Sequence, residues 1–361
     1  MSKEENPKTI LITGGCGFVG SNLAIELKMK YSAYRILVID NLSRSGSELN
    51  ISRLQQHGIK FLHGDLRIKD DLQIEEKIDC IIDAAAEASA LAGIHSSTDY
   101  VINTNFNGTV NTLNLALKHK ADLIFLSTSR VYPIQYLESI NYEETEDRFE
   151  ISALQSLEGI TQKGISEAFP LNKARTIYGT TKLASELLIE EYKEFLGLNF
   201  VINRCGVITG PCQMGKVDQG VIVLWMARHF WKKSVSYIGY NGTGKQVRDI
   251  VSINDVFTLI DFQIHNIKKV NGETFNVGGG REISVSLKEL TNWCSLITGN
   301  KIQINSVKES RKGDIPIYIS DCRKISQVSL WKPEKNVEEI LENIFEWIKS
   351  NERQLKPILD K

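Results

Sequence analysis

The sequence predicts an α/β fold in which helices cover both faces of a parallel sheet. Short β-branched runs alternate with amphipathic helical stretches through the first half of the chain, which is the pattern of repeated βαβ units. A second observation is an apolar run that leads directly into three spaced glycines. The third is length, since 361 residues allow one large or two modest domains with a substantial core.

The strands of this sheet should be the runs that are rich in β-branched and aromatic residues. We expect them at residues 9–12, 35–39, 60–62, 80–84, 123–127 and 199–203. The clearest helical patterns between them cover residues 19–30, 105–118 and 180–195. A doubly wound, Rossmann-type sheet binds its ligand beyond the carboxyl ends of its strands, so the site residues should follow strands.

The alternation of strand and helix patterns weakens beyond about residue 204, and a last helix is expected at residues 337–351. We therefore expect a dinucleotide-binding domain over residues 1–204, to which residues 250–280 return. A smaller, mainly substrate-binding domain should occupy residues 205–361.

Composition excludes several kinds of partner. Hydrophobic residues make up 42% of the chain and charged residues 24%, as in ordinary globular proteins, and the formal net charge is −1. That charge gives no overall attraction to nucleic acid or to an anionic membrane, so neither is expected as a partner. No leader or membrane-spanning run is visible, and the six cysteines show neither a CxxC pair nor metal-ligand spacing. We expect a cytoplasmic protein with reduced thiols and no metal.

The strongest local signal is TILITGGCGFVG at residues 9–20, where a buried strand meets three glycines and a helix follows. The first glycine permits the tight turn, the second a close approach of backbone to a pyrophosphate, and the third close helix–strand packing. The phosphates would sit on free N–H groups at the positive end of the helix dipole. This fingerprint predicts a pyrophosphate site lined by Gly14, Gly17, Phe18, Val19 and Gly20.

Asp40 ends the second expected strand, about twenty residues beyond the last glycine, as the fingerprint requires. A carboxylate there accepts hydrogen bonds from the adenosine ribose and repels a 2′-phosphate, which favours NAD over NADP. Arg44 keeps NADP as an alternative cofactor, because an arginine close to Asp40 can accommodate the 2′-phosphate. Asn41 and Ser43 of the same loop are expected in the cofactor site.

Two further strand ends should border the cofactor. Asp65 and Leu66 follow the third strand, beside the expected position of the adenine. The fourth strand ends in small side chains that let the backbone approach the cofactor, at Ala84, Ala85 and Ala86. Taken alone, these residues are equally a turn acid and a packed alanine run.

Tyr178 and Lys182 place a phenol and an ammonium four residues apart on one helical face. A tyrosine with a pKa of about 10 is a poor base at neutral pH, but a nearby lysine and a positive nicotinamide favour the phenolate. Proton exchange with a substrate hydroxyl then becomes feasible. The pair alone is equally a solvated helix face. A second element supports the catalytic interpretation, since LSTSRVY at residues 126–132 places a hydroxyl at the end of the fifth strand.

These motifs together resemble the extended short-chain dehydrogenases/reductases, the NAD-dependent epimerase/dehydratase family that acts on nucleotide-activated sugars. The resemblance continues through GKQVRDIVSINDV, FNVGGG and RKGDIPIYISD, so it covers nearly the whole chain. Within the family, DNLSRSG, HGDLR, STSRVY and VDQG look closest to the CDP-tyvelose (CDP-paratose) 2-epimerases.

The resemblance implies roles for individual residues. Tyr178 resembles the catalytic tyrosine, Lys182 the lysine that binds the nicotinamide ribose, and Thr128 the catalytic serine or threonine. Asn105 matches an asparagine near the active site. The residues expected to contact substrate are Thr128, Ser129, Arg130, Gln219, Arg248 and Arg311.

Two of these residues, Arg248 and Arg311, resemble arginines that clamp the diphosphate of a sugar nucleotide. The alternative for them is an ion pair with Asp249 or Asp314.

The sequence also departs from parts of the family. The 4,6-dehydratases carry an Asp-Glu pair directly after the threonine, where this chain has Ser129 and Arg130. The related decarboxylases have a glutamate where Arg130 stands, so both chemistries are disfavoured. Pro133, Val207 and a long stretch at 132–178 depart as well, so sugar contacts made by these parts cannot be transferred.

The chemistry that the resemblance implies is redox-neutral epimerisation at C2 of a CDP-linked deoxyhexose, through a transient keto sugar and retained NADH. A nucleotide-sugar 4-epimerase and a net dehydrogenase or reductase are the nearest alternatives. A non-catalytic, NAD-sensing protein is another, although it could dispense with the Thr128, Tyr178 and Lys182 that are present here. The resemblance also implies a homodimer, paired through the helices near 105–118 and 180–195.

Overall fold

A seven-stranded parallel sheet organises the fold in the computed structural model, which describes residues 6–94, 96–215 and 219–360. Its strands are β1 (Thr9–Thr13), β2 (Arg35–Asp40), β3 (Lys60–His63), β4 (Cys80–Asp83), β5 (Asp122–Thr128), β10 (Phe200–Cys205) and β14 (Glu273–Val277). They stand in the order β14-β10-β5-β4-β1-β2-β3. The order reverses between β1 and β4, so the carboxyl ends of these two strands flank the crevice where such a sheet binds its ligand.

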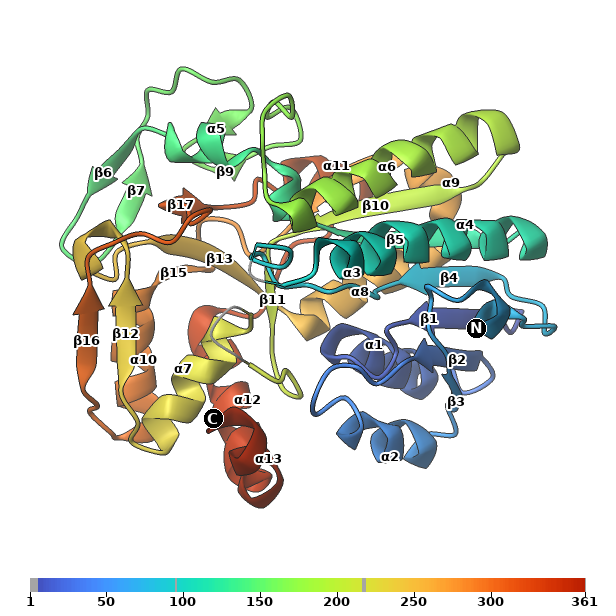
Figure 1. Ribbon diagram of the computed structural model, residues 1–361, viewed down its shortest axis with the longest axis horizontal. Coiled ribbons are helices and arrows are strands. Elements are labelled where there is room, and N and C mark those ends of the chain that lie inside the picture. The colour runs from blue at the N-terminus through green and yellow to red at the C-terminus, as the bar shows by residue number, and fades with distance from the viewer. Residues whose placement is uncertain (1–5, 95, 216–218, 361) are drawn as a thin grey trace.

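Helices cover both faces of this sheet (Figure 1). One layer contains α1 (Phe18–Lys30), α2 (Leu49–Gln56) and α8 (Ile253–His265), and α4 (Gly108–His119) and α6 (Ile177–Leu196) belong to the other. The short helices α3 (Thr98–Ile102), α9 (Ile267–Val270) and α11 (Arg323–Ser329) complete the large unit.

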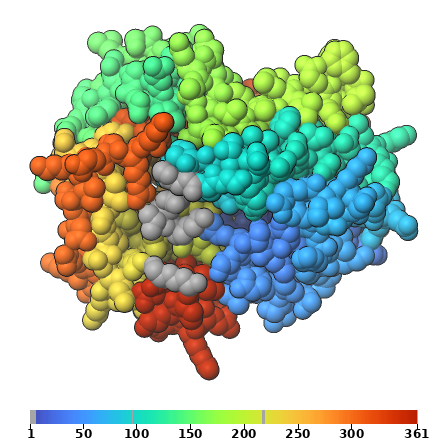
Figure 2. Space-filling model, viewed as in Figure 1, coloured from blue at the N-terminus to red at the C-terminus, as the bar shows by residue number. Residues whose placement is uncertain are grey.

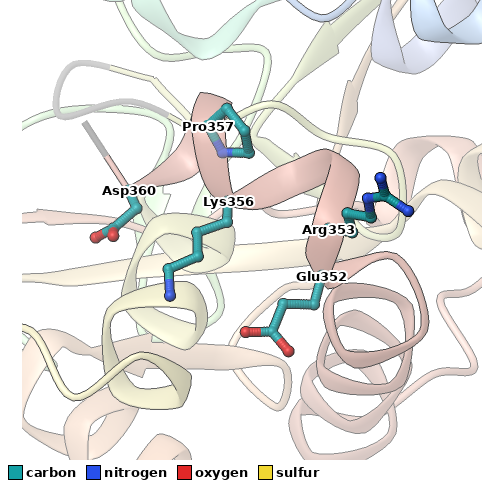
Figure 3. A pocket seen from close by; sticks show the side chains of 5 residues that line it. All are labelled: Glu352, Arg353, Lys356, Pro357 and Asp360. Carbon is teal, nitrogen blue, oxygen red and sulfur yellow. The ribbon is translucent and has the colours of Figure 1, made fainter.

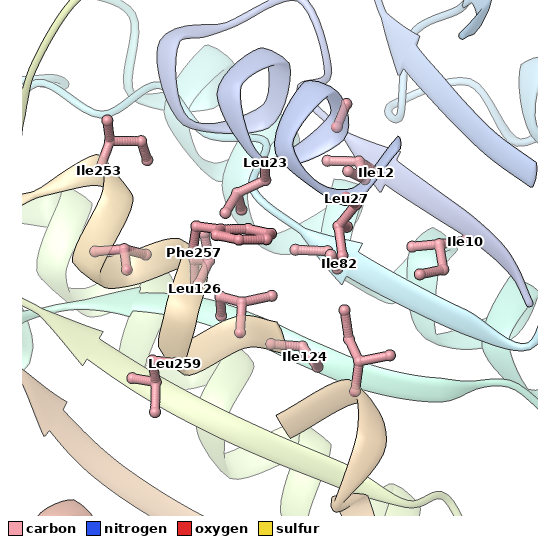
Figure 4. Close-up of a cluster of buried hydrophobic side chains, with 14 of the residues drawn as sticks. Ile10, Ile12, Leu23, Leu27, Ile82, Ile124, Leu126, Ile253, Phe257 and Leu259 are labelled. Atoms are coloured by element: carbon pink, nitrogen blue, oxygen red, sulfur yellow. The ribbon is translucent and has the colours of Figure 1, made fainter. Parts of the chain in front are cut away.

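Alternation along the strands fills the two cores. Ile10 and Ile12 of β1 pack into the core that contains α1 and α8, whereas Leu11 belongs to the core of α4 and α6. Figure 4 shows the first of these cores, with Leu23 of α1 and Phe257 of α8 among its side chains. Strands that are buried on both faces explain the continuous apolar runs in the sequence.

The predicted fold class is confirmed, and each of the six expected strands begins and ends within two residues of its observed bounds. The helix expected at 105–118 is different at its start, because residues Asn103–Asn107 form a π-helical turn before α4 begins. The last predicted helix is α12 (Val337–Ser350), and the additional α13 (Glu352–Leu359) was not expected. Asn351 separates these two helices, and Pro357 inside α13 masks its pattern.

In addition to the two cores of the large sheet, the C-terminal part of the chain builds a separate core beside a four-stranded sheet (Figure 1). The sheet contains β11 (Val207–Thr209), β13 (Val247–Ser252), β15 (Ser284–Ser286) and β17 (Ile317–Tyr318). Helices α7 (Val221–Phe230), α10 (Leu287–Thr298), α12 and α13 pack beside the pair β12 (Val235–Ile238) and β16 (Ile304–Val307). In Figure 2 these yellow-to-red segments and the blue first third of the chain occupy opposite sides of the visible face.

The long stretch between β5 and α6 forms a further small hydrophobic cluster against β17. It holds α5 (Ile134–Glu138), β6 (Tyr142–Glu144), β7 (Phe149–Ile151), β8 (Ile160–Thr161) and β9 (Gly164–Ile165). After α7 the chain crosses repeatedly between the sheets, since β13 lies in the second sheet and β14 at the edge of the first. The domain boundary near residue 204 stays a prediction.

Two further observations limit the chemistry of the molecule. Among the described residues, no cluster of histidine, cysteine and carboxylate side chains is arranged to hold a metal ion. Within the same part of the chain, none of the helices combines the length and apolar character that crossing a membrane requires.

Candidate active site

The glycine turn after β1 is built by close backbone packing. Gly14 has φ +62°, and a Cβ there would lie 2.8 Å from Cα of Ala85. A Cβ on Gly20 would lie 2.4 Å from the carbonyl oxygen of Gly14, so only glycine lets α1 start against the turn. At the first turn of α1 the N-cap is Gly17, and no side chain caps it. The amide groups at this helix end are therefore left for an anionic ligand.

Asp40 holds the glycine turn from the end of β2. Its carboxylate accepts hydrogen bonds from the backbone N–H groups of Cys16 (3.0 Å) and Leu42 (2.8 Å). Burial raises the pKa of Asp40, and the backbone hydrogen bonds oppose that rise. Each carboxylate oxygen has a second acceptor position, so binding a ribose hydroxyl is compatible with these contacts.

The residues after β4 are anchored to the neighbouring strand β1 and, through Asn105, to α6. The Thr13 hydroxyl donates to Asp83 (2.6 Å) and accepts from the N–H groups of Ala84 and Ala85, each at 3.2 Å. Asn105, in the π-helical turn, accepts from the N–H of Glu87 (2.7 Å) and donates to the Thr181 hydroxyl of α6 (3.3 Å).

Asn105 is 1% exposed, and each of its side-chain bonds goes to protein. The structure therefore places Asn105 as a support for the wall formed by residues 84–87.

The loop after β2 contains two polar groups with other partners than the sequence suggests. Asn41 donates to Asp65 (3.0 Å), which also pairs with Arg67. Arg44 donates to Gln219 (2.6 Å) and to the backbone carbonyl of Met214 (2.7 Å), across 175 and 170 residues of sequence. Its guanidinium thus joins the cofactor loop to the segment before α7. The backbone N–H of Ser43 donates a hydrogen bond to the side-chain oxygen of Asn41 (3.1 Å).

Thr128 and Tyr178 meet at the end of β5. Both side chains line one cavity, and the Thr128 hydroxyl lies close enough to the Tyr178 phenol to favour its ionised form. Gly179 explains how closely the two elements approach, because a Cβ there would lie 2.0 Å from the carbonyl oxygen of Arg130. Sequence reasoning did not assign this glycine a role, although a glycine directly after the tyrosine of a helix start is a signal for such packing.

The electrostatic state of the tyrosine depends on its neighbours. Burial raises the pKa of Tyr178 to about 12, and the Thr128 hydroxyl and the charge of Arg130 act in the opposite direction. Burial lowers the pKa of Lys182 to about 8, although the carboxylates of Asp83 and Glu186 favour its charged form. The Lys182 ammonium lies 3.8 Å from the centre of the Phe125 ring, and the residue is 1% exposed.

A buried ion pair one turn beyond Lys182 locks α6 onto the sheet. Glu186 binds Arg204 of β10 through three hydrogen bonds of 2.7–3.2 Å, and both side chains are almost fully buried. Ser127, directly before Thr128, donates to the same carboxylate. The pair therefore fixes α6 relative to the end of β5.

Two features of the sequence indicate this ion pair, although the motifs discussed above do not include them. A glutamate four residues after Lys182 lies on the buried helix face, and an arginine stands inside the apolar strand β10. Two opposite charges at buried positions require each other.

A cavity of about 820 Å³ runs from the glycine turn to the C-terminal part of the chain. Phe18, Val19, Ala84 and Ala86 line one end of it, and Thr128 and Tyr178 its middle. The same cavity is also lined by further residues predicted to bind substrate, namely Ser129, Arg130, Gln219, Arg248 and Arg311.

The far end of the cavity is bounded by α7, β12 and α10, including Trp225 and Arg228. The stretch 216–218, which overlaps the VDQG motif, lies outside the described residues.

The predicted alternative for Arg248 is present in part. Its guanidinium lies 3.3 Å from Asp314 and donates to the Ile315 carbonyl (2.7 Å), while the same side chain lines the cavity. Arg130 donates to the carbonyl of Gly313 at 3.3 Å.

Another hollow lies at the surface along α13 (Figure 3). Its lining comes from that one helix and consists of Glu352, Arg353, Lys356, Pro357 and Asp360. A hollow that one short surface helix lines by itself lacks the convergent groups of a small-molecule site.

Comparisons with known proteins agree with this geometry. The model of the NAD dependent epimerase/dehydratase family matches residues 10–278. The chain is 30% identical to the CDP-paratose 2-epimerase of Salmonella typhi, over 94% of this chain and 99% of that protein. It is 25% identical to the UDP-glucose 4-epimerase of Halalkalibacterium halodurans, over 95% and 96% of the two chains. The structure of a dTDP-glucose 4,6-dehydratase from Bacillus anthracis in complex with NAD aligns with a TM-score of 0.75 at 25% identity, covering 97% of this chain and 99% of that one.

The cofactor named by the family fits the residues present. The uncapped start of α1 offers N–H groups to a pyrophosphate, Asp40 stands at the end of β2, and Ala84 and Ala86 leave the cavity wall open beside them. The chain therefore belongs to the NAD dependent epimerase/dehydratase family, and its cofactor is NAD.

Proposed function

We propose that the chain is a CDP-sugar 2-epimerase that inverts C2 of a deoxyhexose through a transient keto sugar. The observation that carries the proposal is the juxtaposition of Thr128 and Tyr178, set in the wall of one cavity between the NAD end and three arginines. The similarity to the CDP-paratose 2-epimerase of Salmonella typhi over nearly the whole chain supports the choice of sugar nucleotide and of ring carbon.

The residues of the chain divide the proton chemistry between them. Thr128 holds the reacting hydroxyl in place, and Tyr178 as phenolate takes its proton and later returns it. The charged form of Lys182 stabilises the phenolate in this buried region, as does the positive nicotinamide of bound NAD. Bound NAD would supply the acceptor for the hydrogen that leaves the ring carbon as hydride. The carbon is inverted because this hydrogen returns to the opposite face, after the keto sugar has reoriented in the cavity.

Elimination chemistry has less support. Ser129 and Arg130 occupy the two positions after Thr128, so neither offers the carboxyl group that would protonate or deprotonate a sugar carbon. The 4-epimerase alternative differs from the proposal only in the ring carbon, and a net dehydrogenase would release its reduced cofactor.

A screen of nucleotide sugars tests the proposal directly. Purified protein is incubated with CDP-paratose and with matched UDP- and dTDP-hexoses, and the products are identified by NMR. We expect inversion at C2 of the CDP-sugar without steady absorbance gain at 340 nm. Steady accumulation of NADH would make the chain a dehydrogenase, and inversion at C4 would make it a 4-epimerase. No turnover of any sugar would favour the NAD-sensing alternative.

We further propose that residues 205–361 supply most substrate contacts and that two chains pair through α4 and α6. In support, α6 leaves Leu187 57%, Phe195 75% and Leu196 55% exposed. Light scattering of wild-type protein and of Leu187→Glu measures this pairing, and equal masses at the monomer value would contradict it.

A further inference from the structure

Arg130 is held beside both proposed catalytic residues by its own backbone. Its N–H donates to the Thr128 hydroxyl oxygen at 3.2 Å, and its carbonyl oxygen packs against Gly179, next to Tyr178. The side chain lines the cavity and donates to the Gly313 carbonyl at 3.3 Å. Its position is therefore fixed relative to the hydroxyl on which Thr128 and Tyr178 act.

Arg248 reaches the two residues that follow Gly313, and it does so from a different strand. Its guanidinium, carried by β13, donates to the Ile315 carbonyl at 2.7 Å and lies 3.3 Å from Asp314. Two guanidinium groups from distant parts of the chain thus converge on residues 313–315, at the wall of one cavity.

The charge of this wall is strongly positive. Of the described residues that line the cavity, four are arginines, Arg130, Arg228, Arg248 and Arg311, and one is acidic, Asp314. Burial lowers the pKa of Arg130 to about 10, and the like charge of Arg248 acts in the same direction. An anion placed between the two guanidinium groups would remove this repulsion.

We propose that Arg130 and Arg248 bind one phosphoryl group together, the one that joins the nucleotide to the sugar. This rests on the proposed function and deepens it, because the position of Arg130 then selects the ring carbon. A residue two positions from Thr128 reaches that phosphoryl group only if the phosphate lies beside the reacting hydroxyl. The C2 hydroxyl neighbours the anomeric carbon that carries the phosphate, whereas the C4 hydroxyl lies across the ring. Arg130 thus favours reaction at C2.

Nucleotide binding by the full-length, NAD-loaded protein tests whether Arg130 binds the phosphoryl group or the sugar. Calorimetric titrations compare CMP with CDP on wild-type protein and on Arg130→Met. The second phosphate should strengthen binding to the wild type, and Arg130→Met should weaken CDP binding by about 10–100-fold while CMP binding stays the same. Arg281→Met is the matched control, since Arg281 is 46% exposed, pairs with Glu150 and should bind CDP like the wild type.

An unchanged ratio of CDP to CMP affinity in Arg130→Met would overturn the inference and assign Arg130 to the sugar. Failure of the wild type to bind CMP, CDP, UMP or UDP would instead overturn the proposed function itself. Turnover of CDP-paratose that carries deuterium at C2 or at C4 gives an independent reading. Slowing by the C2 label supports the selection of C2, and slowing by the C4 label contradicts it.

Discussion

The two ends of the cavity are built in different ways. At the NAD end, the turn at Gly14–Gly20 uses backbone amides, a single carboxylate and residues close in sequence. At the substrate end, Arg130, Arg248 and Arg311 come from three distant segments and meet only in the folded chain. The NAD end is built mainly by one βαβ unit, whereas the substrate end depends on how the smaller sheet packs against the large one. The expected cofactor site is therefore largely local, whereas the proposed substrate site is assembled from distant segments.

The largest effect should come from the residue that connects the two ends. Tyr178→Phe should lower turnover by roughly 10²–10⁴-fold, because the phenol is the proposed proton acceptor. NAD content and CDP affinity should stay at wild-type values, as measured by absorbance and calorimetry. Tyr192→Phe is the matched control, since Tyr192 lies on the same helix and binds Asn114 outside the cavity. Equal turnover in the two variants would remove Tyr178 from the mechanism.

Breaking the buried ion pair should destabilise the frame that both ends share. Glu186→Ala leaves Arg204 charged and buried, so the free energy of unfolding should fall by about 3–5 kcal/mol. Glu346→Ala is the control, because it removes an exposed carboxylate that pairs with Lys349. It should change the free energy of unfolding by less than about 1 kcal/mol. Denaturant unfolding compares them. Similar losses would show that the buried pair does not hold α6.

The glycine turn permits a test in which backbone strain is matched. Gly14→Ala and Gly58→Ala both place alanine at positive φ, +62° and +67°, which costs about 1–2 kcal/mol. Only Gly14 has backbone near the added Cβ, whereas nothing lies within 4 Å of it at Gly58. Gly14→Ala should therefore also lose bound NAD, while CDP affinity changes little. Retention of NAD by both variants, measured after gel filtration, would contradict a local cofactor site.

The smallest effect is a change in the pH profile. Because burial lowers the pKa of Lys182 to about 8, its charge is present below that pH and lost above it. Turnover should therefore decline as pH rises past about 8. In Lys182→Arg the guanidinium stays charged, so the normalised decline should move to higher pH. An identical alkaline decline in both proteins would assign it to another group.

The parts that could be predicted from the sequence are those governed by local periodicity and turn chemistry. The strands and the fold class follow from the alternation of strand and helix patterns, since all strands of the large sheet except the edge strand β3 are largely buried on both faces. Gly14, Asp40 and the meeting of Thr128 with Tyr178 follow from motifs placed at strand ends.

The rest depends on long-range contacts that no local pattern encodes. The partners of Arg44 lie 170 and 175 residues away, and Arg130 finds Gly313 across 183 residues. Asn105 lies in a π-helical turn and binds the backbone of Glu87 and the Thr181 hydroxyl. The division of roles around residue 204 and the pairing of chains are still predictions.

Arg44 has a thermodynamic consequence. It belongs to the NAD loop but holds Met214 and Gln219, and Gln219 stands directly before α7, which borders the substrate end. One side chain thus connects the loop at the NAD end with the segment before α7. By reciprocity, whatever factor NAD occupancy applies to the affinity for sugar nucleotide, the sugar nucleotide must apply to the affinity for NAD.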